Sequence, residues 1–150
     1  MKQVLINQVK QYFNVRELVC KHVYDKFGDN SWMFLDEKLL ETLLIIRKNI
    51  DRPITVNNWA SGGPYSQRGI RCNICQLVKD KTIKGQLYMS AHRQGLAVDF
   101  DVKGMTAQEV REWISKNIVL FPHNIRLEKG VNWVHLDVFD LGNKLTYFNG

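Results

Sequence analysis

Two short segments of the sequence, residues 90–99 (SAHRQGLAVD) and 133–137 (WVHLD), carry the side chains best suited to chemistry. They supply two imidazoles and a carboxylate, those of His92, His135 and Asp99. A catalytic zinc ion takes three protein ligands of these types and keeps its fourth position open for water. A lone histidine or aspartate is more often a hydrogen-bonded or solvated residue. It is the combination that predicts a metal site here.

The local sequence also indicates how these side chains would be positioned. We expect His92 in a loop that turns sharply at Gly95 and enters a strand. In that strand apolar residues alternate with the face that carries Asp99, and a second strand repeats this pattern around His135. The buried face would consist of Leu96, Val98 and Phe100 in the first strand and of Val134, Leu136 and Val138 in the second.

The two motifs, S-x-H-x-x-G-x-A-x-D and W-x-H-x-D, resemble those of the M15 zinc peptidases, with a likeness that extends over residues 53–138. That family includes D-alanyl-D-alanine carboxypeptidases and many phage endolysins, and its fold is shared with the zinc-binding domain of hedgehog proteins. The resemblance implies that His92, Asp99 and His135 bind Zn²⁺. It also implies a bacterial peptidoglycan stem peptide as substrate, with a D-amino acid near the bond that is cut.

The position where the family usually carries its general base holds a different type of residue in this chain. Many M15 members place Glu or Asp three residues before the last histidine, where this chain has Asn132. Glu128 would share the face of that histidine if residues 129–132 form the turn and Glu128 pairs with Trp133. Asp137 shares the face by alternation, and it is better placed to orient a neighbouring side chain. We therefore predict that Glu128 is the base and that Asp137 supports it.

A glycine-rich loop at residues 57–71 is a third candidate for chemistry. Arg71 is the nearest match to an arginine that faces the site in many M15-like enzymes, and Arg68 is its competitor. A guanidinium would hold a substrate carboxylate or a developing oxyanion, or would instead brace the loop by bonding backbone carbonyls. Trp133 and Ser90, next to the candidate ligands in sequence, are further candidates for substrate contacts together with Arg68.

The cysteines do not predict a second site. There are three of them, and this odd number argues against a disulfide framework. Cys72 and Cys75 have CxxC spacing, but only Cys20 remains to join them, and a structural zinc site normally needs four ligands. We expect the CxxC pair to be two small residues near a helix start. His22, in an expected helix without an acidic or imidazole partner, and His123, in a loop, are expected to have no ligand role.

The composition is that of a small globular enzyme. The chain has 150 residues, 45% hydrophobic and 24% charged, which predicts one domain over residues 1–150. No apolar run has membrane-spanning length, and the first residues lack the apolar core of a signal peptide. We expect synthesis in the cytoplasm and action at the cell wall after release or export.

The net charge of +6 favours binding to polyanions, but the basic residues do not cluster along the sequence. No nucleic-acid partner is therefore expected.

The order of the elements predicts an α+β domain in which helices pack on a small antiparallel sheet, as in the hedgehog and D-Ala-D-Ala peptidase fold. Capping signals begin helices at Asn14, Asp36 and Thr106, and Gly28 ends the first of them. A short helix is expected over residues 73–79. Strands are expected from residue 53, over residues 96–102, as a hairpin of residues 125–128 and 133–138, and at a sheet edge over residues 144–148.

These observations predict an M15-type zinc peptidase, a carboxypeptidase or endopeptidase of phage, prophage or bacterial origin. The zinc ion would lower the pKa of its water toward ~7 and polarise the scissile carbonyl. The alternative is a zinc-containing module without turnover that recognises cell-wall peptide or a protein partner. Asn132 favours that alternative, because a carboxamide cannot accept the proton of the attacking water.

Overall fold

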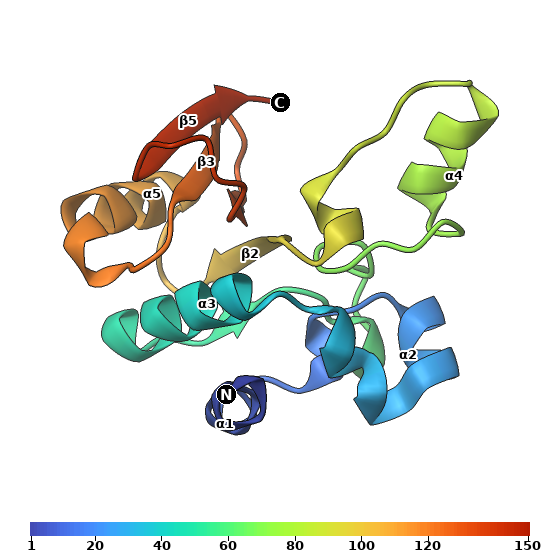
Figure 1. The fold of residues 1–150 in the computed structure, drawn as a ribbon, viewed down its shortest axis with the longest axis horizontal. Helices are drawn as coiled ribbons and strands as arrows, with labels where there is room; N and C mark the ends of the chain where they lie inside the picture. Colours follow the sequence, from blue (N-terminus) through green and yellow to red (C-terminus); the bar gives the residue numbers. More distant parts are fainter.

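The computed structural model describes residues 1–150 and shows the predicted α+β architecture (Figure 1). Its five α-helices are α1 (Lys2–Val9), α2 (Lys21–Phe27), α3 (Glu37–Ile50), α4 (Gln76–Ile83) and α5 (Ala107–Lys116). Its strands are β1 (Ile54–Thr55), β2 (Ala97–Val102), β3 (Ile125–Lys129), β4 (Val134–Asp137) and β5 (Leu145–Asn149). The sheet order is β1-β2-β4-β3-β5. The expected edge strand β5 lies parallel to β3, so the sheet is mixed rather than wholly antiparallel.

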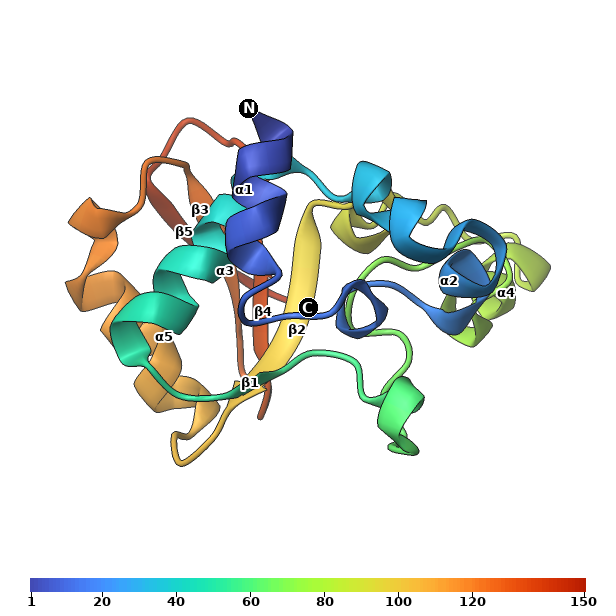
Figure 2. The same cartoon turned by 90° about the horizontal axis from the view of Figure 1, so that it is seen from below.

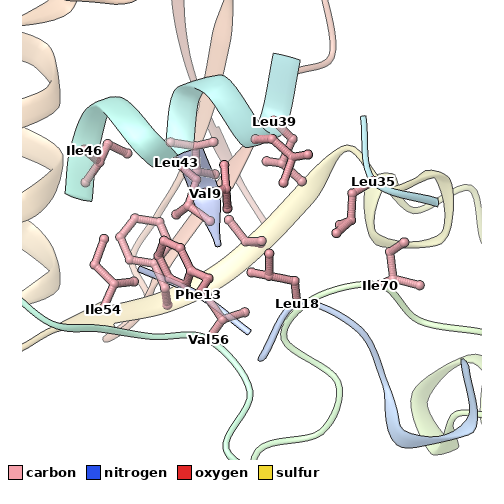
Figure 3. Close-up of a cluster of buried hydrophobic side chains, with 14 of the residues drawn as sticks. Val9, Phe13, Leu18, Leu35, Leu39, Leu43, Ile46, Ile54, Val56 and Ile70 are labelled. Carbon is pink, nitrogen blue, oxygen red and sulfur yellow. The ribbon is translucent and has the colours of Figure 1, made fainter. Parts of the chain in front are cut away.

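The hydrophobic core lies between one face of the sheet and the helices α1 and α3, which cross that face in Figure 2. Apolar residues recur along α3 at helical spacing, and Leu39, Leu43 and Ile46 point from it toward β2 (Figure 3). From the sheet, Val98 and Phe100 are buried in the same cluster. The strands therefore bury one face and keep the opposite face for polar side chains.

Two of the predicted helix starts are confirmed. The Asp36 side chain accepts the backbone N–H of Lys38 at the start of α3. Thr106 and Glu109 form a capping box that begins α5, each side chain accepting a backbone N–H of the other. Both helices are amphipathic and bury their apolar faces in the core against which β2 also packs.

The helix expected over residues 14–27 is wrong in its first half. The Asn14 capping box forms, but it begins only a single 3-10 turn, and α2 starts at Lys21. Between them the chain pairs with a distant segment: Cys20 donates to the Ile70 carbonyl (3.1 Å), and Ile70 donates to the Leu18 carbonyl (2.9 Å). These long-range hydrogen bonds replace the helical ones. Gly28 does end α2, as predicted.

The approach of these two segments is close enough to require a glycine. A Cβ at Gly69 would lie 2.1 Å from the Leu18 carbonyl oxygen, so any larger residue would push the segments apart. The helix expected over residues 73–79 begins three residues later, as α4. Residues 72–75 instead form a turn in which the Cys75 N–H donates to the Cys72 carbonyl (3.3 Å).

Helices α2 and α4 lie at the same end of the molecule, where Figure 1 shows them one above the other and apart (Figures 1 and 2). Each buries a single residue, Val23 in α2 and Val78 in α4. This end therefore has little apolar core of its own. No helix in the structure is both long enough and apolar enough to cross a membrane.

Candidate metal centre

His92, Asp99 and His135 converge on the polar face of the sheet, as the sequence predicts. Their ligand atoms lie within 4.8 Å of one another, and all three residues are buried. Asp99 in β2 stands directly opposite His135 in β4. Its carboxylate oxygens lie 2.7 Å from His135 Nδ1 and 3.3 Å from His92 Nε2. Two imidazoles and one carboxylate thus point at a common centre.

A short 3-10 helix, Ala91–Gln94, brings His92 to the strands. Ser90 begins it, with its hydroxyl accepting the His92 backbone N–H (3.2 Å). Gly95 ends it with φ of 71°, and a Cβ there would lie 1.9 Å from the Phe34 carbonyl oxygen. Only glycine tolerates both the positive φ and this close approach of a carbonyl, so the predicted turn at Gly95 is confirmed. Ser90 therefore positions His92, and it also lines the cleft described below.

The outer nitrogen of each imidazole is held by an acceptor. His92 Nδ1 donates to the Gly69 carbonyl (2.9 Å), and His135 Nε2 donates to the Asp137 carboxylate (2.8 Å). These hydrogen bonds leave His92 Nε2 and His135 Nδ1 facing Asp99. Metal-binding histidines in proteins are usually held in this way, by a carbonyl or carboxylate on the nitrogen away from the metal.

Asp137 is fully buried and makes no contact with solvent. Besides His135 it binds Arg126 through two hydrogen bonds, of 2.8 and 2.9 Å. Burial alone would raise the pKa of Asp137, but the hydrogen bonds from His135 and Arg126 outweigh burial and lower it. Its carboxylate is committed to these two side chains and to the backbone N–H of Phe139, which it accepts at 3.2 Å. This arrangement suits the supporting role expected of Asp137 and not that of a base.

The charges at the centre are set by competition between burial and hydrogen bonding. Burial lowers the pKa of His92. For Asp99 burial acts in the opposite sense, but hydrogen bonds from His135 and His92 outweigh it and hold the pKa of the carboxyl well below its usual range. Burial disfavours charge on His135 as well, yet Asp137 and Asp99 together raise its pKa to about 9. Asp99 is therefore ionised at neutral pH, whereas His135 must release a proton to bind a metal.

The donor set fits zinc. With Zn–N and Zn–O bonds of about 2.0–2.2 Å, tetrahedral geometry sets neighbouring N and O ligands about 3.4 Å apart. The 3.3 Å between His92 Nε2 and Asp99 matches that spacing. The 2.7 Å between His135 Nδ1 and Asp99 is a direct hydrogen bond, whose proton a metal would replace. Replacement requires these two atoms to separate by about 0.7 Å, given the spacing above.

The centre lies in the wall of a cleft of about 330 Å³ that also includes Glu128, Ser90 and Phe148. A second hollow of about 420 Å³ adjoins it and contains Arg68 and Asn132. Both hollows are lined by Asp99 and by two of the predicted substrate-contact residues, Arg71 and Trp133. Trp133 is 37% exposed, so its indole is available to a ligand. The two hollows share these three lining residues beside the candidate metal centre, and we refer to them together as the groove.

Arg71 braces the loop and also contacts the centre. Its guanidinium donates to the Gln67 carbonyl (2.6 Å), to the Tyr88 hydroxyl (2.6 Å) and to Asp99 Oδ2 (3.2 Å). Of the two roles considered for this arginine, the geometry shows the brace, while the contact with a substrate carboxylate or oxyanion stays a prediction. Arg68 lies farther along the groove, where it binds Asp101 (3.0 Å) and stacks over a tyrosine ring of the same loop.

Glu128 reaches the cleft through a strand register that differs from the one expected. Arg126 pairs with Asp137 in the β3–β4 ladder, which sets Glu128 opposite His135 rather than opposite Trp133. The shift is two residues, so the side chain keeps the expected face of the sheet. Glu128 is partly exposed and lines the same cleft as the three candidate ligands.

A second cluster of metal-ligating side chains contradicts the expectation for the cysteines. Cys20, His22, Cys72 and Cys75 each place one ligand atom within 4.8 Å of the others. His22 supplies the fourth ligand that counting cysteines alone had missed. The signal was in the sequence, as a Cys-x-His pair at residues 20–22 and the CxxC pair. His123, by contrast, binds Glu41 (2.7 Å) and joins neither cluster.

Comparisons of the chain with protein families, with curated proteins and with solved structures find no match. The geometry of the two clusters and the resemblance of the two motifs are therefore what bears on function.

Proposed function

We propose that this protein is a zinc-dependent peptidase that cleaves a peptide bond in bacterial peptidoglycan stem peptides. The observation that carries the proposal is the convergence of His92, Asp99 and His135 in the wall of a groove, with the outer nitrogen of each imidazole already held. Three such ligands leave the fourth position of a zinc ion for chemistry. The motifs that resemble M15 peptidases are the same residues that the fold brings together.

When bound, zinc would supply Lewis acidity, which polarises a carbonyl and makes water a stronger acid at neutral pH. Glu128 is the carboxylate in the cleft without a structural ion pair, and it accepts the proton of the attacking water and returns it to the leaving amine. Asp137 holds a proton on His135 Nε2, so that Nδ1 is the nitrogen that gives up its proton and becomes a ligand. Arg71 fixes one oxygen of Asp99.

The groove supports a peptide substrate. Its walls combine an exposed indole, Trp133, with the guanidinium groups of Arg68 and Arg71. An indole packs against a peptide backbone or an apolar side chain, while a guanidinium binds a carboxylate. Stem peptides carry free carboxylates along a short chain. The net charge of +6 favours such an anionic polymer.

One observation favours a second candidate, a zinc-containing binding module for cell-wall peptide or a protein partner. Asn132, which stands where many M15 enzymes have a carboxylate, lines the adjoining hollow and cannot accept a proton. In this case Glu128 would be a groove residue and would have no role in proton transfer. The same groove would bind peptide and release it unchanged.

Mass spectrometry of peptidoglycan after incubation with the zinc-loaded protein separates the two candidates. A peptidase produces shortened or uncrosslinked stem peptides, loses this activity in a chelator and regains it when zinc is restored. The His92→Ala, His135→Ala double variant should be inactive, and His123→Ala, outside both clusters, should be fully active. Zinc-loaded protein that sediments with peptidoglycan but releases no product would overturn the peptidase and support the binding module.

A further inference from the structure

We propose that Cys20, His22, Cys72 and Cys75 form a second, structural zinc site that joins α2 to the loop before α4. The site is independent of the candidate catalytic centre and shares no ligand with it. Thiolates and imidazole are the ligands that zinc selects in structural sites, and Cys₃His is one of the usual four-ligand sets.

The interatomic distances match a tetrahedron around zinc. With Zn–S bonds of about 2.3 Å and Zn–N bonds of about 2.0–2.1 Å, two sulfurs should lie about 3.8 Å apart, and a sulfur and a nitrogen about 3.5 Å. The Sγ atoms of Cys72 and Cys75 are 3.8 Å apart. His22 Nδ1 lies 3.4 Å from Cys72 Sγ and 3.8 Å from Cys75 Sγ. These three ligands therefore already have the spacing that the metal requires, and the ligand atom of Cys20 lies within 4.8 Å of each of them.

A disulfide, a core of small residues and a catalytic zinc site each fit this cluster less well than a structural zinc site does. A disulfide would bring two sulfurs to about 2.05 Å, and all three cysteines are free. A buried core of small residues would not include His22, which is exposed to solvent and yet turns its Nδ1 toward the sulfurs. A catalytic zinc site would leave one position without a protein ligand, whereas four ligand atoms converge here.

Local structure places the four ligands without strain. Cys20 is the residue before α2 and His22 lies in its first turn, so both point to the start of that helix. Cys75 is the residue before α4, and its N–H bonds to the Cys72 carbonyl in a tight turn. The backbone hydrogen bond from Cys20 to Ile70 then sets the two pairs side by side.

A metal would also explain how this end of the molecule is held together. Helices α2 and α4 bury one residue each, and the apolar residues around the turn and α4 are largely outside the core: Ile74 is 55% exposed, Leu77 46% and Ile83 73%. So little apolar burial supplies little stability. Small structural units of this kind are commonly held by zinc, whose binding energy contributes to folding.

The decisive experiment uses the His92→Ala, His135→Ala variant, which keeps all four ligands of the second site. We expect this protein, purified in reductant, to retain about one zinc ion per chain, because one four-ligand site binds one ion, against about two in the unmodified protein. Replacing zinc by cobalt should then give the thiolate-to-cobalt charge-transfer absorption that only sulfur ligands produce. Elemental analysis and absorption spectroscopy measure the two quantities.

Two single histidine substitutions, one inside the cluster and one outside it, provide the test and its matched control. His22→Ala in the same background should lose most of the remaining zinc, while His123→Ala, which breaks an ion pair elsewhere, should keep it. Folding of each variant is checked by circular dichroism. A folded His92→Ala, His135→Ala protein that binds no zinc or cobalt would overturn the second site. That result would leave the peptidase proposal intact, since peptidoglycan cleavage by the unmodified protein tests it separately.

Discussion

The substitution Asp137→Asn tests how the protein prepares His135 to bind a metal. The Asp137 carboxylate can only accept hydrogen bonds, so it holds one histidine proton on Nε2, and the proton that a metal replaces is the other one, on Nδ1. Asparagine has nearly the same shape but can turn its amide N–H₂ toward Nε2. The neutral ring then keeps its single proton on Nδ1, the atom that faces Asp99 and the metal. The variant changes the tautomer of His135 and leaves all three candidate ligands in place.

The expected loss follows from this indirect role. Removing the partner of a metal-binding histidine typically weakens metal affinity 10–100-fold, which corresponds to about 1.4–2.7 kcal/mol. Because Asp137 is fully buried and also pairs with Arg126, we expect the upper part of this range. Loss of the ion pair should in addition lower the melting temperature. That second effect is measured on the metal-free protein, where it is separate from zinc affinity.

Competition with a chromophoric chelator measures the zinc dissociation constant. The His92→Ala, His135→Ala protein gives the contribution of the Cys20 cluster, which is subtracted. Asp140→Asn is the matched control: this aspartate lies three residues farther along, is exposed and binds only Asn124 and the Gly142 N–H. A folded Asp137→Asn protein with unchanged zinc affinity would refute the proposed control of the tautomer.

Three further predictions concern the same centre. Glu128→Gln should keep zinc and peptide binding but lower turnover roughly a hundredfold, the usual effect of losing a general base. Peptide hydrolysis at saturating substrate measures this turnover. Full activity would exclude Glu128 as the base. The zinc affinity of the His92, Asp99 and His135 centre should rise about tenfold per pH unit between pH 7 and 9 and then level off. The reason is that the metal must displace the proton of His135, whose pKa is about 9. A flat profile in the same chelator competition would contradict this. Gly95→Ala should destabilise the fold by more than about 1 kcal/mol, because alanine would have to adopt a positive φ and its Cβ would collide with the Phe34 carbonyl. Urea unfolding measures this loss. An unchanged unfolding midpoint would show that the turn can relax.

The first cluster could be predicted from the sequence because two of its three members lie in regular strands. Alternation along the strands assigns Asp99 and His135 to the same face, and in an antiparallel pair such residues can stand opposite each other. Gly95 marks the turn that brings His92 to them. What the sequence did not specify is the β3–β4 register, since a shift of two residues preserves every face. The position of Glu128 along the strand was therefore wrong although its face was right.

The second cluster could not be predicted by spacing along the chain. Fifty residues separate His22 from Cys72, and the expected helix over residues 14–27 would have turned Cys20 and His22 to different faces. Helix propensity and an Asn14 cap favoured that helix, but the pairing of Cys20 with Ile70 breaks it. Tertiary hydrogen bonds override local propensity here. The same bonds bring the Cys-x-His pair to the CxxC turn.

The two clusters are joined through one short segment of backbone, residues 68–72. The Arg68 carbonyl accepts the backbone N–H of Asp99 (2.6 Å), and the Gly69 carbonyl accepts His92 Nδ1 (2.9 Å). Arg71 then binds the Asp99 carboxylate, and Cys72 follows it directly in the second cluster. A metal at the cysteines would therefore fix the end of the segment that positions the ligands of the first centre. The two proposed sites would then be complementary, because accurate placement of the ligands of an open zinc site requires a rigid support.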